Sequence, residues 1–247
     1  LAFASGPVLA ADADSATAHP FSIRDLVMMD RVGDPQLSPD GRYALFTVRA
    51  TDYAANKGVT SIYVMDLNKP PQPVKVVEKG SSPRWAPDGK SIFYTAAKDG
   101  VAQVWHRAFD ADNANGLALT VRTGDAVTTA PLDVGSFKLS PDGSKLLLSY
   151  EVFTDCADLA CTKERLDGRE KEKSTGTVYD KLFVRHWDTW ADGRRNQLYI
   201  ADANSASQPV LLSRDIDGDV PSKPFGGEDE FTFSPDGKTV YFDVRIA

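Results

Sequence analysis

The sequence has few cysteines, no surplus of positive charge and no long hydrophobic run. Its 28 lysines and arginines stand against 35 aspartates and glutamates, a net charge of -7. The basic residues form no stripe of the kind that phosphate backbones attract, so we expect no nucleic acid partner. No apolar run reaches the roughly 20 residues that cross a bilayer, so we expect no membrane span.

Motifs for catalysis and for cofactor binding are also missing. The nucleophile motif G-x-S-x-G does not occur, and the three histidines (His19, His106 and His186) have no nucleophile beside them in the sequence. No Gly-rich phosphate loop is present, so no nucleotide cofactor is implied. The two cysteines have no nearby histidine that would complete a metal site. We therefore expect neither catalytic residues nor metal ligands nor a cofactor in this chain.

The first residues indicate export. Residues 1–13 read LAFASGPVLAADA, an apolar segment of small residues that ends in alanines, as a signal peptidase requires. We interpret residues 1–19 as a signal-peptide remnant with a linker, and we expect a periplasmic or secreted protein. A plain alanine-rich tail is the alternative.

The two cysteines lie close together, in the sequence TDCADLACTK. Because a disulfide persists in an exported protein, we predict a bond between Cys156 and Cys161, with a pair of free thiols as the alternative. Closing so short a loop stabilises a fold by about 2 kcal/mol in the chain-entropy model, which gives the bond a role in local ordering.

A short repeat determines the predicted architecture. Ser-Pro-Asp-Gly or Ala-Pro-Asp-Gly occurs at residues 38–41, 86–89, 140–143 and 234–237. Serine suits the first position of a type I β-turn, proline the second and glycine the fourth. Short apolar segments precede these turns and longer segments rich in β-branched and aromatic residues follow them, so each turn is expected to connect two strands.

The spacing of the repeat is that of a β-propeller. The turn prolines lie at 39, 87, 141 and 235, so the steps are 48, 54 and 94 residues, against roughly 40 to 50 for one blade. Only one segment in the long step, QLYIADA at 197–203, repeats the third-strand pattern of the earlier units. The long step is therefore one blade with an insertion at about 153–195. Its charged part, KERLDGREKEK, is interpreted as solvated surface.

The predicted fold is all-β: a partial propeller of four-stranded antiparallel blades, with three blades and the start of a fourth. One propeller domain is expected over residues 20–247, with three blades at about 34–80, 81–130 and 131–213 and the start of a fourth at about 228–247. A propeller protects its sheet edges by closing a ring, so we expect the natural polypeptide to continue. Ser22 and Asp25 form a capping-box pattern, which predicts a short helix packed outside the first blade.

Several segments resemble known proteins. The opening FSIRDLVMMDRVGDPQLSPDGRYALF, the segment YDKLFVRHWDTWADGRR at 179–195 and the segment PFGGEDEFTFSPDG at 224–237 are similar to propellers of the prolyl oligopeptidase family, in particular its bacterial dipeptidyl aminopeptidases and acylaminoacyl peptidases. The repeat alone also occurs in TolB-like periplasmic binding propellers, which are the alternative.

The resemblance implies a C-terminal α/β-hydrolase domain of the same polypeptide, with a Ser, Asp and His triad that this chain lacks. The propeller would cap that domain, filter peptide substrates and help to hold their N-terminal end. The fragment alone would be inactive.

Two groups of residues are candidates for substrate binding. Arg185, Trp187, Asp188 and Trp190 concentrate aromatic and charged groups in the insertion, which suits gripping a peptide or docking on the hydrolase domain. The alternative is that the tryptophans pack the insertion onto its own blade. Glu228, Asp229 and Glu230 follow two glycines and offer carboxylates to the α-ammonium group of a peptide. Their alternative role is that of solvated loop acids.

Overall fold

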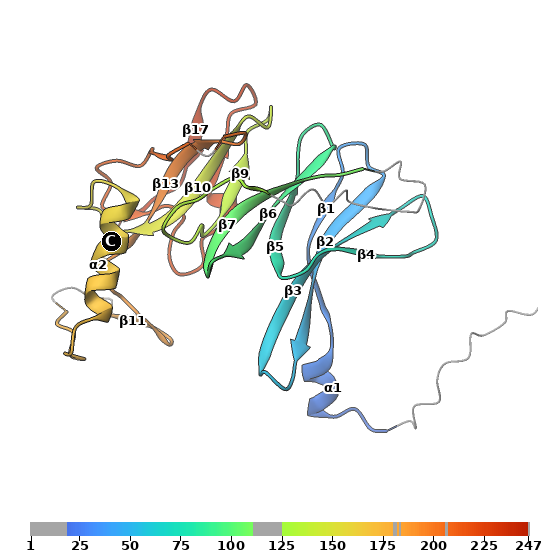
Figure 1. Ribbon diagram of the computed structural model, residues 1–247, viewed down its shortest axis with the longest axis horizontal. Coiled ribbons are helices and arrows are strands. Elements are labelled where there is room, and N and C mark those ends of the chain that lie inside the picture. The colour runs from blue at the N-terminus through green and yellow to red at the C-terminus, as the bar shows by residue number, and fades with distance from the viewer. Residues whose placement is uncertain (1–18, 111–124, 180–181, 183, 206, 247) are drawn as a thin grey trace, which may run out of the picture.

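The computed structural model describes residues 19–110, 125–179, 182, 184–205 and 207–246. Three four-stranded antiparallel sheets follow one another along the chain (Figure 1). The first contains β1 (Arg31–Leu37), β2 (Tyr43–Asp52), β3 (Lys57–Asp66) and β4 (Val74–Val77). The second contains β5 (Gly80–Trp85), β6 (Ser91–Lys98), β7 (Val101–Ala108) and β8 (Asp125–Ala126). The third contains β9 (Phe137–Leu139), β10 (Lys145–Val152), β13 (Arg195–Asp202) and β14 (Val210–Leu211).

A fourth sheet begins near the end of the chain. Strands β16 (Phe231–Phe233) and β17 (Val240–Phe242) pair with each other, and β15 (Gly218–Asp219) pairs with β18 (Arg245–Ile246). The strands of each four-stranded sheet are ordered as they occur in the chain, apart from the insertion between β10 and β13. These sheets confirm the predicted all-β partial propeller with three blades and the start of a fourth.

The repeated turns have the predicted geometry. Each glycine has a positive φ, between 68° and 72°, and its N–H donates to the carbonyl three residues earlier at 2.8 to 2.9 Å. In the third sheet, Ser140 Oγ donates to Asp142 Oδ1 at 2.6 Å and accepts the N–H of Lys145 at 2.9 Å. Ser38 and Ser234 make the same pair of bonds, whereas Ala86 has no hydroxyl to make them.

Successive turns also touch one another. A Cβ atom placed on Gly143 would lie 3.1 Å from Cδ of Pro87, and one on Gly89 would lie 3.4 Å from Cδ of Pro39. The glycine of one turn therefore lies close to the proline of the turn before it. The positive φ favours glycine at each of these turns, and the approach of Pro87 leaves little room for a side chain at Gly143.

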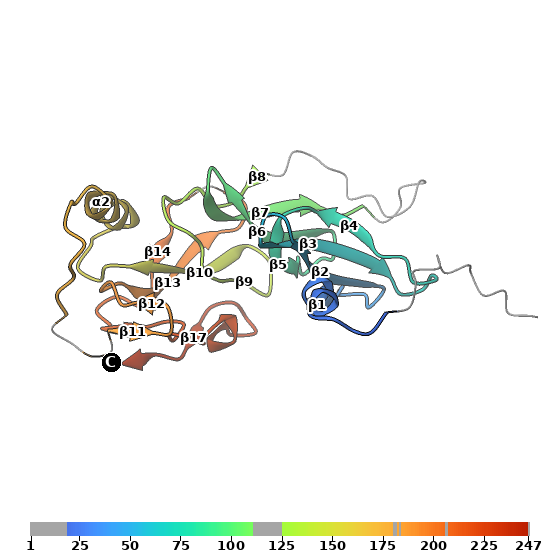
Figure 2. The same cartoon turned by 90° about the horizontal axis from the view of Figure 1, so that it is seen from below.

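The sheets lie beside one another along the molecule (Figure 2). Apolar side chains fill the space between neighbouring sheets. Leu45 and Ile62 of the first sheet pack with Ile92 and Tyr94 of the second. On the opposite face of the second sheet, the side chains Phe93 and Val104 pack with residues of the third sheet, among them Leu146, Leu148 and Tyr150. Leu147 and Leu198 of the third sheet pack against Phe231 and Phe233 of the fourth. The second and third sheets are thus buried on both faces.

A buried glutamine occupies the same place in the second and third sheets. Gln103 is 2% exposed; its Nε2 donates to the carbonyls of Ala130 and Leu132, and its Oε1 accepts the hydroxyl of Thr128 at 2.7 Å. These partners lie in the connection to the next sheet. A glutamine amide has two donors and one acceptor, so it satisfies this buried backbone without water.

Gln197 repeats the arrangement in the third sheet. It is also 2% exposed; its Nε2 donates to the carbonyls of Ile216 and Gly218, and its Oε1 accepts the hydroxyl of Ser213 at 2.6 Å. In the first sheet, Ser61 is at the position that corresponds to Gln197. The residue after Ser61, Ile62, pairs with Thr47, and the residue after Gln197, Leu198, pairs with Ser149 in the same way.

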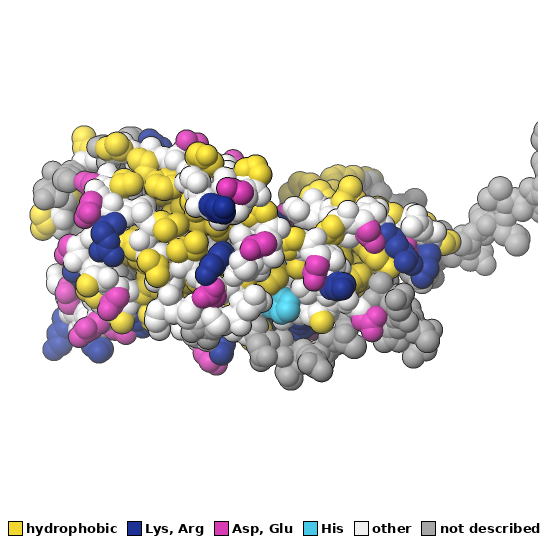
Figure 3. All heavy atoms as spheres, turned by 90° about the horizontal axis from the view of Figure 1, so that it is seen from above, with side chains coloured by type: hydrophobic (Ala, Val, Ile, Leu, Met, Phe, Trp, Pro, Cys, Tyr) yellow, Lys and Arg dark blue, Asp and Glu magenta, His cyan; other side chains and the backbone are white. Residues whose placement is uncertain are grey.

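Helix α1 (Ile23–Met28) begins at the predicted capping box, with Ser22 as its N-cap. Thr51 of β2 donates to the carbonyl of Val27 at 2.7 Å, so the helix lies against the first sheet as expected. Within the described residues, no helix has the length and apolar character of a membrane span. The predicted signal-peptide remnant at 1–13 lies outside the described residues. Figure 3 shows acidic and basic side chains interspersed on one face, with hydrophobic side chains gathered on the half that carries the third sheet.

Candidate functional site

The insertion between β10 and β13 contains a helix that the sequence analysis did not predict, α2 (Leu159–Glu170). Asp158 is its N-cap and accepts the N–H of Cys161, and the predicted disulfide between Cys156 and Cys161 is present at this end. Arg165 and Arg169 lie over the ring of Phe153 at 4.5 and 4.6 Å. The charged segment is therefore partly a packing surface, because the guanidinium groups cover an aromatic ring.

The insertion then forms a hairpin of β11 (Arg185–His186) and β12 (Thr189–Trp190), which carries the first group of predicted binding residues. Arg185 lies 5.2 Å from the centroid of Trp190, and its Nε donates to the carbonyl of Trp187. Trp187 has a φ of 49°, which is unfavourable for a bulky residue. Its side chain is 73% exposed and that of Trp190 is 54% exposed. The tryptophans are therefore not packed onto the insertion's own blade.

Phe225 joins this hairpin to the second group of candidates. It is 75% exposed, and its ring makes edge contacts with His186 at 5.4 Å and with Trp187 at 5.8 Å between centroids. The rings of His186 and Trp187 are themselves 4.8 Å apart. The three side chains form an aromatic cluster, in which Trp187 and Phe225 are exposed and His186 is half-buried. Phe225 was not identified from the sequence, although the same segment, PFGGEDE, contains both it and the acids.

The acids lie in a 3-10 helix, η1 (Glu228–Glu230). The Glu228 carboxylate binds the guanidinium of Arg84 through both oxygens. Nη1 of Arg84 also reaches both oxygens of Asp34, at 2.9 and 2.8 Å. Burial opposes the charge of Arg84, but its hydrogen bonds to Glu228 and Asp34 outweigh burial and raise its pKa. Glu228 is thus neither a solvated loop acid nor an unoccupied carboxylate.

Each of these three residues lies in a different sheet or in the segment that leads into one. Asp34 is in β1, Arg84 is in β5, and Glu228 begins η1, which directly precedes β16. The first strands of the first and second sheets and the segment that leads into the fourth therefore meet at one ion cluster, with two carboxylates and one guanidinium. The cluster carries one net negative charge, which favours a cationic group nearby.

The other two acids have different surroundings. Glu230 accepts the N–H and the hydroxyl of Ser222 at 2.6 and 2.7 Å, so it fixes the start of the segment that carries Phe225. A Cβ on Gly226 would collide with the backbone of Ser222, so this turn requires glycine. Asp229 is exposed between its two neighbours. Of the three carboxylates, that of Asp229 is the most accessible to a ligand.

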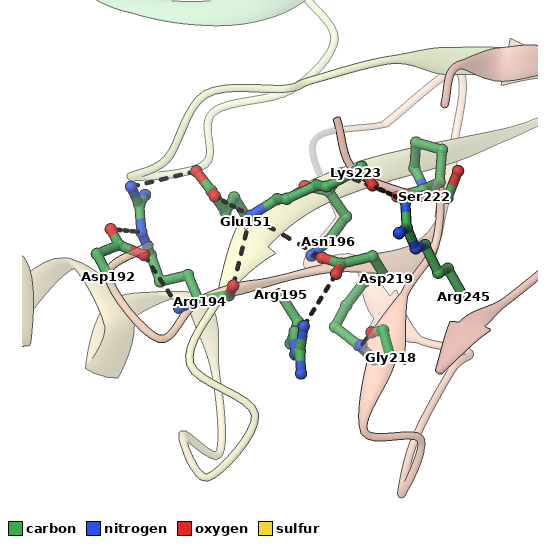
Figure 4. Close-up of polar contacts among 12 residues, drawn as sticks. Glu151, Asp192, Arg194, Arg195, Asn196, Gly218, Asp219, Ser222, Lys223 and Arg245 are labelled. Atoms are coloured by element: carbon green, nitrogen blue, oxygen red, sulfur yellow. Dashed lines mark hydrogen bonds and ion pairs between the residues drawn. The ribbon is translucent and has the colours of Figure 1, made fainter. Parts of the chain in front are cut away.

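A network of charges lies where the insertion joins its sheet (Figure 4). Glu151, in β10, binds Lys223 and also Arg194, the latter at 3.1 Å. Asp219 binds Arg195 at 3.2 Å and accepts the N–H of Asn196 at 2.8 Å. The network links both ends of the insertion to the segment that precedes the fourth sheet.

Phe225 connects the two predicted groups. Trp187 contacts Phe225, three residues before Glu228. An apolar surface and an acidic group placed side by side can bind a peptide through a side chain and a cationic group. Among the described residues there is no group of three or more His, Cys, Asp or Glu side chains that could hold a metal ion.

No family model matches the chain. In sequence the chain is similar to the dipeptidyl-peptidase 5 of Porphyromonas endodontalis, 28% identical over 229 residues, which are 89% of this chain and 30% of that protein. It is also similar to the dipeptidyl-peptidase 5 of Porphyromonas gingivalis, 26% identical over 224 residues, 88% of this chain and 30% of that protein. The chain therefore spans less than a third of the length of these relatives.

The fold is similar to that of the acylaminoacyl peptidase of Pyrococcus horikoshii, with a TM-score of 0.54 and 16% identity over 76% of this chain and 25% of that one. Together the sequence and structure comparisons confirm the resemblance that the turn repeats and the segments at 179–195 and 224–237 indicated.

Proposed function

We propose that this chain, a propeller portion of the prolyl oligopeptidase family, belongs to an exported serine exopeptidase of the dipeptidyl or acylaminoacyl type. In it, the propeller caps a hydrolase domain, admits short peptides and helps to bind their N-terminal end. The main support is the similarity to dipeptidyl-peptidase 5 over 89% of the chain. The contact of Trp187 with Phe225, which lies three residues before η1, supports a binding role for this part of the chain.

The parent gene provides the first test. We expect a G-x-S-x-G motif downstream of residue 247, followed by Asp and His, and cleavage of dipeptidyl or acylaminoacyl substrates that a serine-directed inhibitor abolishes. This chain alone should be inactive in the same assay. A downstream sequence of further repeats without that motif would leave a TolB-like binding module instead. Cell fractionation tests the periplasmic or secreted location.

Trp187→Ala tests the aromatic part of the site in the full-length parent. Because Trp187 is exposed, its removal should change the unfolding midpoint little. If the ring contacts substrate, KM should rise about tenfold with kcat nearly unchanged. Trp190→Ala serves as a comparison on the opposite strand. Loss of stability without a change in KM would contradict the binding role.

Asp229→Asn and Glu228→Gln test the acidic part. If these carboxylates receive an α-ammonium group, each change should raise KM about tenfold for peptides with a free N-terminus and leave acylated peptides unaffected. Glu228→Gln should also weaken the bond to Arg84, so Asp229→Asn is the cleaner variant. Equal effects on free and acylated peptides would exclude recognition of the N-terminus by these residues.

A further inference from the structure

Lys223 occupies a junction in the charge network at the base of the insertion (Figure 4). Its Nζ forms an ion pair with Glu151, donates to the carbonyl of Arg194 at 3.4 Å and lies 3.9 Å from Asp219 Oδ1. Glu151 precedes the last residue of β10, where the chain enters the insertion. Arg194 directly precedes β13, where the chain returns. One side chain therefore contacts both ends of the insertion.

The backbone around Lys223 is also held on both sides. The carbonyl of Lys223 accepts a hydrogen bond from Nη1 of Arg245 at 2.8 Å. The preceding residue, Ser222, is fixed by the Glu230 carboxylate. Two residues further on, Phe225 contacts Trp187 of the insertion hairpin. The position of Phe225 relative to the hairpin is thus set by two separate connections, one through the aromatic rings and one through Lys223.

The ion pairs of Lys223 are poor candidates for a role in global stability. The side chains of Lys223 and Glu151 are 33% and 37% exposed, and ion pairs this accessible contribute little to the free energy of unfolding. Glu151 would keep Arg194 as a partner if Lys223 lost its charge. What would be lost is the link between the insertion and the Phe225 segment.

We propose that Lys223 is a positioning residue for the binding edge: it ties the segment with Phe225 to both ends of the insertion and so holds the aromatic cluster in place. Lys223 acts through Phe225 and has no contact with substrate. The inference rests on the proposed function, in which this cluster binds the peptide.

The test uses four variants of the full-length parent: Lys223→Met, Lys223→Arg, Phe225→Ala and the double variant of Lys223→Met with Phe225→Ala. Lys145→Met is the matched control, since Lys145 forms an exposed ion pair with Asp202 between β10 and β13, outside this network. We expect Lys223→Met to raise KM about fivefold with kcat within about twofold, and Lys223→Arg to restore most of the loss. Lys145→Met should match the wild type.

The double variant separates positioning from direct contact. If Lys223 acts through Phe225, the double variant should have the KM of Phe225→Ala alone, because neighbours on one route are not additive. Additive effects, or a Lys223→Met variant indistinguishable from Lys145→Met, would overturn the proposal.

A second measurement needs no catalytic activity. Acrylamide quenching of tryptophan fluorescence is measured for each protein with and without Trp187→Phe. The difference between the two gives the contribution of Trp187. Lys223→Met should change this contribution and Lys145→Met should not; an unchanged value would overturn the positioning role even if the parent is not a peptidase. Conversely, a changed value in a parent without peptidase activity would sustain the positioning role and reject the proposed function.

Discussion

The second and third sheets are the same unit with different connections. Strands β6 and β7 are joined by a turn at Asp99 and Gly100, whereas β10 and β13 are joined by residues 153–194, with a helix, a disulfide and a hairpin. Both sheets nevertheless keep the buried glutamine and its hydroxyl partner, and both close their first turn with Pro-Asp-Gly. In both sheets, therefore, the buried glutamine holds the connection to the next sheet. The outer hairpin is free to take up an insertion.

The largest expected effect is on the buried glutamines. Gln103→Leu and Gln197→Leu should each lower the free energy of unfolding by about 3 kcal/mol, because each leaves two carbonyls and a hydroxyl buried without their partner. Urea unfolding measures both. Similar losses of unfolding free energy would support the equivalence of the two sheets. A loss confined to Gln103→Leu would contradict it.

An intermediate effect is expected from the disulfide, which exists only in the third sheet. Replacing Cys156 and Cys161 together by serine should cost about 2 kcal/mol, mainly in local ordering. Hydrogen exchange should become faster in α2 and stay unchanged in β5 to β7. Reduction of the wild-type bond should reproduce this pattern. Faster exchange in the second sheet would show that the insertion also stabilises the neighbouring blade.

The smallest expected effect is on the pKa of a turn aspartate. The third sheet has Ser140 at the first position of its turn, whereas the second sheet has Ala86 there. The Ser140 hydroxyl, with the N–H and hydroxyl of Ser144, lowers the pKa of Asp142 from 3.8 to about 2. This contribution to stability is present above the unfolded pKa and is lost as the pH falls through about 2. Ser140→Ala should raise the pKa of Asp142 toward 3.8. Carboxyl titration by NMR measures it, and an unchanged pKa would assign the shift to Ser144.

Much of the fold could be predicted because the repeat combines a turn requirement with flanking strands. Proline, aspartate and glycine at fixed positions specify the bend, and the recurrence of the third-strand pattern at QLYIADA separated one blade with an insertion from two blades. The helix in the insertion was missed because half of its residues are charged and it shows no apolar stripe. Asp158 as a cap and the pair Lys163 and Asp167 at i and i+4 were the available signals.

The candidate site could be predicted only in part. Trp187 and Glu228 were identified because aromatic and acidic residues cluster locally in the sequence. Their partners Phe225, Arg84 and Asp34 were not, since ion pairs between residues 50 and 144 positions apart leave no local pattern. The sequence also could not show that Glu228 forms an ion pair with Arg84. This pairing leaves the neighbouring Asp229 as the better candidate for ligand binding.

The contact between the glycine of one turn and the proline of the turn before it has a consequence for how such a chain can evolve. The proline of one turn lies beside the glycine of the next turn. The outcome of a mutation at Gly89 or Gly143 therefore depends also on a proline roughly fifty residues earlier in the chain. Duplicating or deleting a blade is then tolerated when whole corners are gained or lost together. Substitution of any of these glycines is opposed by its positive φ, and substitution of Gly143 is opposed also by Pro87 of the preceding turn.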